Sequence, residues 1–182
     1  MKLPFLIICI SAMAIACSPV KVLNTEQGDN IDFTKYKTYN FYRLKASGDT
    51  VSKLFEGRID ILKNAISNEL NKRGYTLATS NPDMLVNIGV VVKDEVQTRQ
   101  TDFRTDAPRY IGQRNYSWKS ETIEVGRYRE GTVTVHLVDA VQNKMIWKGT
   151  IEGVIPEKTT AIQKTAEEGI KKLFEKYPVV TR

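Results

Sequence analysis

Hydrophobic residues recur at two different spacings along this chain of 182 residues, and the order of the spacings restricts the fold. Two segments repeat at intervals of three or four residues, which is the period of an amphipathic helix. Segments around them alternate at every second residue, which is the period of a half-buried strand. Because each element must bury its apolar face against another, the sequence predicts helices packed on a sheet.

Both helical patterns have recognisable ends. The first runs from about Lys53 to Arg73, with Ser52 as the expected N-cap and Gly74 as a C′ glycine. Its apolar stripe consists of Phe55, Ile59, Leu62, Ile66 and Leu70. The second begins just after Pro156 and ends at Pro178, which cannot continue a helix. Its stripe consists of Ile162, Ala166, Ile170, Leu173 and Tyr177.

The strand patterns lie before and between the two helices. Aromatic and polar residues alternate from Tyr36 to Tyr42, which predicts a first strand. The segment from Met84 to Val154 is interpreted as a four-stranded antiparallel meander. Its strands would be Met84–Lys93, Tyr116–Tyr128, the run Val133–Leu137 and Ile146–Val154, with turns at Arg129–Gly131 and Gln142–Lys144. The predicted fold is α+β: a two-layer sandwich with a mainly antiparallel sheet of about five strands, in chain order β-α-β-β-β-β-α, and two helices on one face.

The first residues are typical of an export signal. Met1 and Lys2 give a short positive start, the run from Leu3 to Ala12 is almost wholly apolar, and small residues follow. This run is far shorter than the roughly 20 residues that a membrane-spanning helix needs. Residues 1–16 are therefore interpreted as a signal peptide, in preference to a transmembrane helix or a buried N-terminal helix.

The end of this signal resembles the bacterial lipobox. Small residues in Ala14-Ile15-Ala16 precede Cys17, although the commonest lipobox has leucine in place of Ala14. The resemblance implies that Cys17 receives a diacylglyceryl group before cleavage, and two acyl chains anchor a protein stably to a membrane. Ser18 follows the cysteine, and similarity to other lipoproteins then favours the outer membrane, with the protein facing the periplasm.

Composition and charge set further limits. Residues 17–30 have no apolar period and are interpreted as a lipidated tether, with a single α+β domain over residues 31–180. Cys9 would leave with the signal peptide, so no disulfide or thiolate metal site is expected. The net charge is +6, or +5 without the Lys2 that the signal carries. An exported chain seldom meets nucleic acid, so this modest basic charge favours anionic glycans or lipid head groups as partners.

No catalytic or metal-binding constellation is visible in the sequence. His136 is the only histidine, and it lacks a nucleophile motif or a second ligand at metal-binding spacing. Asp139 ends a strand at a turn, where its carboxylate is expected to accept backbone N–H groups. Trp147 is expected in the core, with Gly149 and Gly153 making room for its ring or for a helix. No cofactor or metal is therefore predicted.

The connection between the second and third predicted strands is unusually long. It runs from about Gln97 to Asn115 and carries four arginines and two aromatic residues: Arg99, Phe103, Arg104, Arg109, Tyr110 and Arg114. Arginine can bind phosphate or carboxylate with two parallel hydrogen bonds, and aromatic rings stack on sugars or on side chains. The alternative is a merely solvated loop, because Asp102 and Asp106 offset part of its charge.

Several short motifs together resemble domain-of-unknown-function family 4136. They are Asp32-Phe33, Tyr36-Lys37-Thr38-Tyr39, Arg58-Ile59, Glu69-Leu70, Arg73-Gly74-Tyr75, Pro82-Asp83, Leu137-Val138-Asp139 and Ile146-Trp147-Lys148-Gly149. The resemblance spans residues 31–178 and implies an exported bacterial lipoprotein with one small α/β domain. The family has no established activity, so only Cys17 is carried over as a functional position.

These observations favour a membrane-anchored lipoprotein of the cell envelope. It would be a non-enzymatic binding or assembly module whose loop or open sheet face meets a protein, a glycan or lipopolysaccharide. The alternative hypothesis is a small envelope hydrolase that acts through carboxylates brought together by folding.

Overall fold

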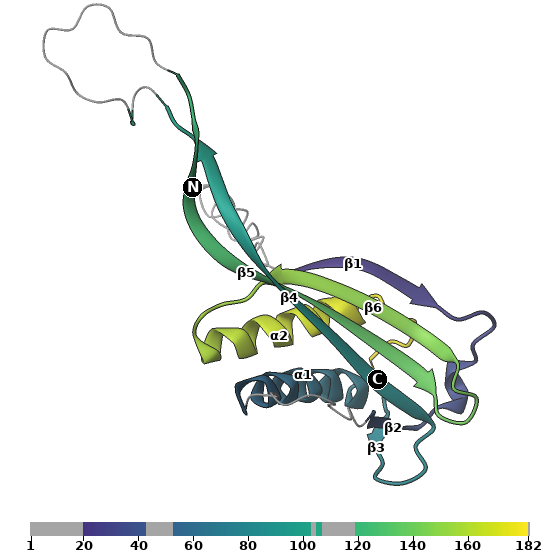
Figure 1. The fold of residues 1–182 in the computed structure, drawn as a ribbon. Helices are drawn as coiled ribbons and strands as arrows, with labels where there is room; N and C mark the ends of the chain where they lie inside the picture. The colour runs from purple at the N-terminus through teal and green to yellow at the C-terminus, as the bar shows by residue number, and fades with distance from the viewer. Residues whose placement is uncertain (1–19, 43–52, 103–104, 107–118, 182) are drawn as a thin grey trace, which may run out of the picture.

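The computed structural model describes residues 20–42, 53–102, 105–106 and 119–181, except for the side chains of residues 53–56. Six strands form one mixed sheet in the order β1-β6-β5-β4-β2-β3, and two helices lie on one of its faces (Figure 1). This arrangement confirms the predicted α+β class and its two layers. The elements are β1 (Val20–Gln27), a short 3-10 helix η2 (Phe33–Lys35), β2 (Thr38–Phe41), α1 (Lys53–Asn71), β3 (Thr76–Leu77), β4 (Met84–Gln100), β5 (Thr122–Asp139), β6 (Met145–Val154) and α2 (Thr159–Phe174).

Strand β1 corrects the predicted start of the domain. The expectation of a tether over residues 17–30, with the domain beginning at 31, is wrong for Val20–Gln27, which pairs with β6 along its length. In this strand only Val20 is buried, and most of the other side chains are exposed. A strand at the sheet edge that is held mainly by backbone hydrogen bonds leaves little apolar alternation for sequence reasoning to detect.

Strand β5 corrects the predicted meander. The expected turn at 129–131 lies inside one continuous strand, so three long strands, and not four, span Met84 to Val154. Gly131 serves close packing rather than a turn, because a Cβ atom there would lie 3.0 Å from the side chain of Ile155. Strand β4 is also longer than predicted and continues to Gln100.

The core lies between the helices and the sheet. The helical stripes supply Ile59, Leu62, Ile66, Leu70, Ile170 and Leu173, and the sheet supplies Tyr39, Val86, Val135, Leu137 and Ile146. Trp147 is 1% exposed, and its ring centroid lies 5.1 Å from that of Tyr177. A Cβ atom at Gly149 would lie 2.7 Å from the Trp147 ring, which confirms that this glycine makes room for it. The ordered burial of both stripes explains why the helices were predictable.

An arginine joins the ends of the two helices. Arg73 donates from Nη1 to the Glu69 carboxylate at 2.7 Å, and from Nη2 to the Phe174 carbonyl at 2.8 Å. Its Nε donates to the Val179 carbonyl at 2.9 Å. Gly74 follows with φ of 85°, the left-handed conformation expected of a C′ glycine. This buried network fixes the end of α1 against the end of α2.

Candidate functional site

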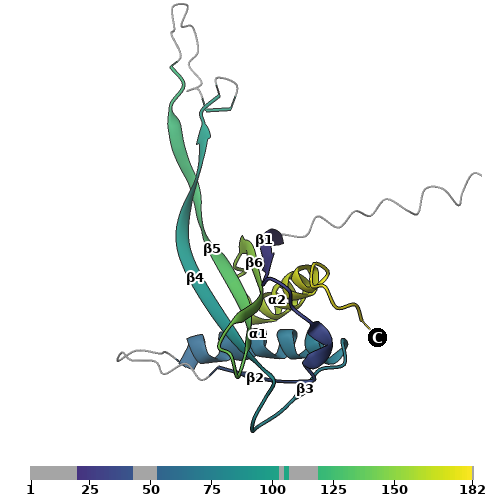
Figure 2. The same cartoon turned by 90° about the vertical axis from the view of Figure 1, so that its right-hand side faces the viewer.

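Strands β4 and β5 extend beyond the rest of the sheet as a two-stranded arm. Their pairing continues to Gln100↔Thr122, whereas β6 covers β5 only from Glu130 onward and β2 covers β4 only as far as Val86. The arm is defined here as residues 93–100 and 122–129, and it rises away from the body (Figure 2). An isolated pair of strands is only marginally stable in water. The arm therefore depends on its continuity with the larger sheet and presents two edges that no described strand covers.

Apolar side chains remain exposed on and beside the arm. Val96 is 49% exposed and Val125 is 46% exposed, and other exposed members are Val91, Val92 and Tyr128. Consecutive valines at Val90, Val91 and Val92 face both sides of β4, so at least one of them must face solvent. Exposed apolar residues gathered on one projecting element are typical of a contact surface. The three-valine run was the sequence signal for this surface, and sequence reasoning missed it.

The register of the arm is supported by charge. Asp94 lies opposite Arg129, and at the base Lys93 lies opposite Glu130. Opposite charges at facing positions favour one register of an antiparallel pair, and a slip by one residue would lose both pairings. The arm is therefore specified by its sequence, although it buries little.

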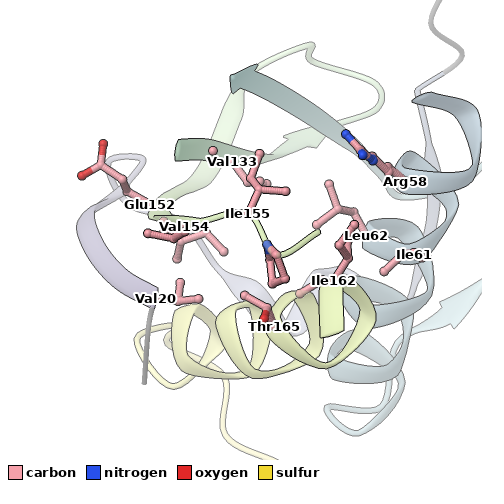
Figure 3. A pocket seen from close by; sticks show the side chains of 15 residues that line it. Val20, Arg58, Ile61, Leu62, Val133, Glu152, Val154, Ile155, Ile162 and Thr165 are labelled. Atoms are coloured by element: carbon pink, nitrogen blue, oxygen red, sulfur yellow. The ribbon is translucent and has the colours of Figure 1, made fainter. Parts of the chain in front are cut away.

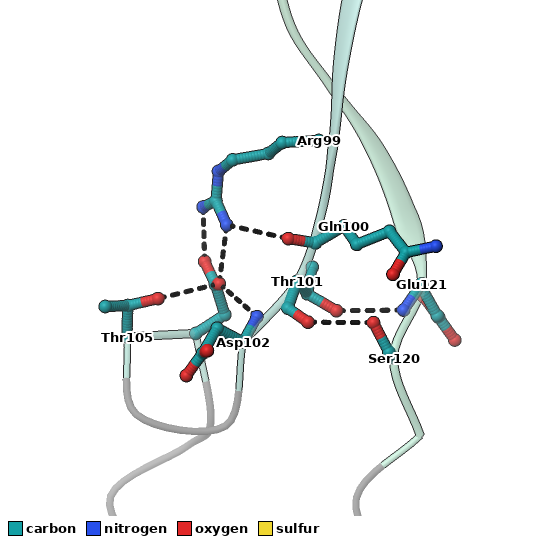
Figure 4. Close-up of polar contacts among 8 residues, drawn as sticks. Arg99, Gln100, Thr101, Asp102, Thr105, Ser120 and Glu121 are labelled. Atoms are coloured by element: carbon teal, nitrogen blue, oxygen red, sulfur yellow. Dashed lines mark hydrogen bonds and ion pairs between the residues drawn. The ribbon is translucent and has the colours of Figure 1, made fainter.

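The far end of the described arm is organised by one ion pair. Arg99 donates from both terminal nitrogens to the Asp106 carboxylate, at 2.7 and 2.5 Å (Figure 4). The same carboxylate accepts the Asp102 backbone N–H at 2.8 Å and the Thr105 hydroxyl at 3.0 Å. The hydrogen bonds from Arg99 have the largest effect, and together these bonds hold the pKa of Asp106 well below its usual range. Asp106 therefore stays ionised and holds Arg99, Thr105 and the backbone of Asp102 together at the end of β4.

The predicted interaction residues fall into two groups. Arg99 lies at the end of β4, and both terminal nitrogens of its guanidinium are hydrogen-bonded to the Asp106 carboxylate. Phe103, Arg104, Arg109, Tyr110 and Arg114 lie outside the described residues, as does Cys17. The binding role of these residues therefore stays a prediction.

The start of β1 lies at the same end of the sheet as the base of the arm. Val20 pairs with Gly153, Gly153 with Gly131, and Gly131 with Val92, so these four residues form one row across the sheet. The arm begins directly beyond this row. Val20, the first residue that the structure describes, therefore lies beside the base of the arm.

An apolar hollow opens near this row, between α1, α2 and the sheet (Figure 3). Its cavity volume is about 110 Å³, and its wall includes the side chains of Leu62, Val133, Ile155, Ile162 and Ala166. Arg58 of α1 lines its edge, and its Nε is the buried side-chain nitrogen that lacks a hydrogen-bond partner among the described residues. No sequence motif pointed to this hollow, because it forms from residues of five separate elements, β1, α1, β5, β6 and α2.

Acidic residues meet at the opposite end of the sheet. Four aspartates, Asp29, Asp32, Asp83 and Asp139, line one polar hollow. The Asp83 carboxylate accepts the backbone N–H groups of Lys37 and Thr38, and these bonds lower its pKa. Asp32, Asp83 and Asp139 already accept local hydrogen bonds.

The Asp139 carboxylate accepts the backbone N–H groups of Gln142 and Val141 and the Tyr36 hydroxyl at 3.0 Å. The Gln142 bond is the main cause that lowers its pKa, while burial and the bond to Asp139 raise the pKa of Tyr36 to about 12. This confirms the predicted turn role of Asp139.

His136 lies half-buried on the sheet face opposite the helices. Burial lowers its pKa, and the nearby Lys148 lowers it further. Lys148 itself is bonded to Glu26 of β1 at 3.0 Å. Among the residues that the structure describes, no cluster of three or more histidine, cysteine or acidic side chains could hold a metal ion.

Comparison with known proteins identifies a family. The model of the family described as "Domain of unknown function (DUF4136)" matches residues 23–179. A search of curated proteins finds no match. Among the described residues, no helix has both the length and the apolar character needed to cross a membrane.

Several solved structures are similar to the chain. A PDZ domain protein from Parabacteroides distasonis is 16% identical with a TM-score of 0.51; the match covers 91% of this chain but only 36% of that protein. A PelC dodecamer from Paraburkholderia phytofirmans is 14% identical with a TM-score of 0.47, and the match covers 90% of this chain and 99% of that protein's chain. A minor lipoprotein from Acinetobacter baumannii is 10% identical with a TM-score of 0.40, and the match covers 78% of this chain and 91% of that protein's chain. The first likeness concerns the fold alone.

Proposed function

This chain belongs to the family described as Domain of unknown function (DUF4136), and we propose that it is a lipid-anchored protein of the bacterial cell envelope. In this proposal it works as a non-enzymatic binding or assembly module, and the arm is its docking element. The single observation that carries the proposal is the arm itself, a specified pair of strands with open edges and exposed valines.

The proposed anchor is supported by the N-terminal sequence. A positive start, a short apolar run and the small residues before Cys17 are typical of an exported lipoprotein. Acyl chains on Cys17 would hold the domain at the membrane. Ser18 after the cysteine favours the outer membrane, with the domain facing the periplasm.

The proposed docking role is supported by what the arm lacks. Val96 and Val125 stay about half exposed, and no described strand covers the outer backbone edges of the arm. Natural sheets usually shorten, cover or charge such edges. A long arm that keeps exposed valines at nearly half of their possible exposure is better explained by a partner that covers it. That partner would be an envelope protein, a glycan or lipopolysaccharide.

Photocrosslinking in intact cells tests this proposal. A photoreactive residue replaces Val96 on the arm, and a matched control carries it at Lys164, an exposed position on α2. We expect a discrete adduct from the arm position, which mass spectrometry identifies, and its loss when Cys17→Ala removes the anchor. Equal adducts from both positions, or none from Val96, would remove the arm from the proposal.

The alternative is a hydrolase acting through paired carboxylates, and among the described residues the hollow of Asp29, Asp32, Asp83 and Asp139 gathers acids in this way. Paired-carboxylate hydrolysis needs one acid that stays protonated near neutral pH. The pKa values of Asp32, Asp83 and Asp139 are lowered, mainly by hydrogen bonds from Thr34, from Lys37 and from Gln142, respectively, which makes these three groups poor candidates for the protonated acid. This pattern supports the non-enzymatic proposal.

A further inference from the structure

The apolar hollow between the helices and the sheet combines a hydrocarbon wall with one cation. We propose that it binds the hydrocarbon chain of a single-chain anionic lipid, with the Arg58 guanidinium at the head group. This site is separate from the arm, so the proposal goes beyond the docking function.

The wall sets the chemistry of the bound segment. Leu62, Ile155 and Ile162 present aliphatic side chains to the hollow, and Thr165 adds one hydroxyl (Figure 3). The cavity, about 110 Å³, is smaller than the roughly 150 Å³ of an apolar cavity that takes up benzene. A few methylenes fill it, and the rest of a longer chain would leave through the open side.

Arg58 sets the chemistry of the head group. Its Nε is buried and has no hydrogen-bond partner among the residues that the structure describes, a state that native proteins rarely keep because the donor has lost water without a replacement. Glu152 also lines the hollow, but its carboxylate points away from the centre, and it accepts a bond from Thr132 instead (Figure 3). An anionic acceptor at the edge would therefore pair with Arg58 without competition from Glu152.

The position of the hollow suggests where such a lipid comes from. Its wall includes Val20, which follows the proposed lipidated Cys17 by three residues. If the chain is anchored as proposed, the hollow lies beside the membrane surface. Only this choice of source rests on the proposed function, since binding in solution does not require the anchor.

Titration of the chain without its proposed signal peptide and lipidated cysteine, residues 18–182, tests the proposal. This chain keeps the whole core, because every buried core residue lies between Val20 and Tyr177. Laurate and lysophosphatidylglycerol, below their micellar concentrations, displace a fluorescent fatty acid, and dodecanol serves as the uncharged control. We expect saturable binding of at least one anionic lipid; which of them binds better distinguishes a free fatty acid from a membrane phospholipid. Across shorter fatty acids, each methylene should improve affinity about threefold to fourfold until the hollow is filled.

Two pairs of variants separate the two contacts. Arg58→Gln should weaken binding of the anionic lipids about tenfold and leave dodecanol unchanged, whereas Arg58→Lys should retain much of it. Ala166→Phe fills the hollow and should abolish binding of all probes, and Gln163→Phe places the same aromatic ring on the exposed face of α2 as a control. Circular dichroism confirms folding, and Ile162→Phe replaces Ala166→Phe if that variant unfolds. The proposal would be overturned if neither anionic lipid bound saturably, or if the variant with phenylalanine in the hollow bound them as well as the unsubstituted chain does.

Discussion

Gly149→Ala offers a direct test of the packing between the sheet and α2. A methyl group at this position would lie 2.6 Å from Leu173 Cδ1 and 2.7 Å from the Trp147 ring. Both neighbours are almost fully buried and cannot move aside without displacing other core residues. Overpacking of this kind lowers the free energy of unfolding by about 1–3 kcal/mol.

Gly89→Ala is the matched control in the same sheet. The nearest atom to its methyl group is the Thr134 carbonyl oxygen at 3.9 Å, an ordinary contact. Both substitutions gain the same stabilisation from a less flexible unfolded chain, about 0.4–1 kcal/mol. The difference between the two variants therefore isolates the clash.

Urea unfolding followed by circular dichroism gives both free energies. A difference of about 2 kcal/mol corresponds to about 4–8 °C in the midpoint of thermal unfolding for a chain of this size. The control should be neutral or slightly stabilised. If both variants unfold at the same urea concentration, within about 0.5 kcal/mol, the contact of Trp147 and α2 at Gly149 is refuted.

Three further predictions concern buried and local charges. Arg73→Met should lower the free energy of unfolding, measured by urea titration, by about 3 kcal/mol, because the buried Glu69 carboxylate would keep only the exposed Lys72 as an ion-pair partner. The double variant with Glu69→Gln should recover part of this loss. Hydrogen bonds from backbone N–H groups lower the pKa of Asp139 in the folded state. Its stabilising effect is therefore complete above the unfolded-state pKa of about 4 and is lost as pH falls through the lower folded-state pKa. Asp139→Asn should flatten the pH dependence of the unfolding midpoint in this acidic range. Asp106→Asn should leave global stability unchanged and speed amide hydrogen exchange at residue 102, as measured by mass spectrometry.

The sequence predicted those elements whose apolar faces are buried over several turns or residues. Ile59 to Leu70 and Ile170 to Leu173 repeat at helical spacing because the helices cover the sheet with one face only. The alternation around Val135 and Leu137 has the same cause. Where burial is one-sided and continuous, local pattern and tertiary contact agree.

The sequence predictions were wrong where the local structure depends on contacts with residues far away in the chain. Gly131 has the composition of a turn, yet it lies in a strand because Ile155 occupies the space of its side chain. Strand β1 has almost no buried side chains and exists because the β6 edge offers backbone partners. The hollow beside Arg58 was equally invisible, since its wall comes from helices and strands far apart in sequence.

The position of β1 restricts how the proposed anchor can present the arm. The three residue steps from Cys17 to Val20 span at most about 11 Å, so acyl chains on Cys17 would hold the row of Val20 and Gly131 close to the lipid head groups. The arm continues beyond this row for eight residues of β4, which is about 26 Å. An arm that stood upright toward the membrane would have to pass through it. The anchored domain would therefore lie with its arm along the membrane surface, where Val96 and Val125 can meet a partner embedded in the same leaflet and the hollow beside Arg58 opens next to the lipid.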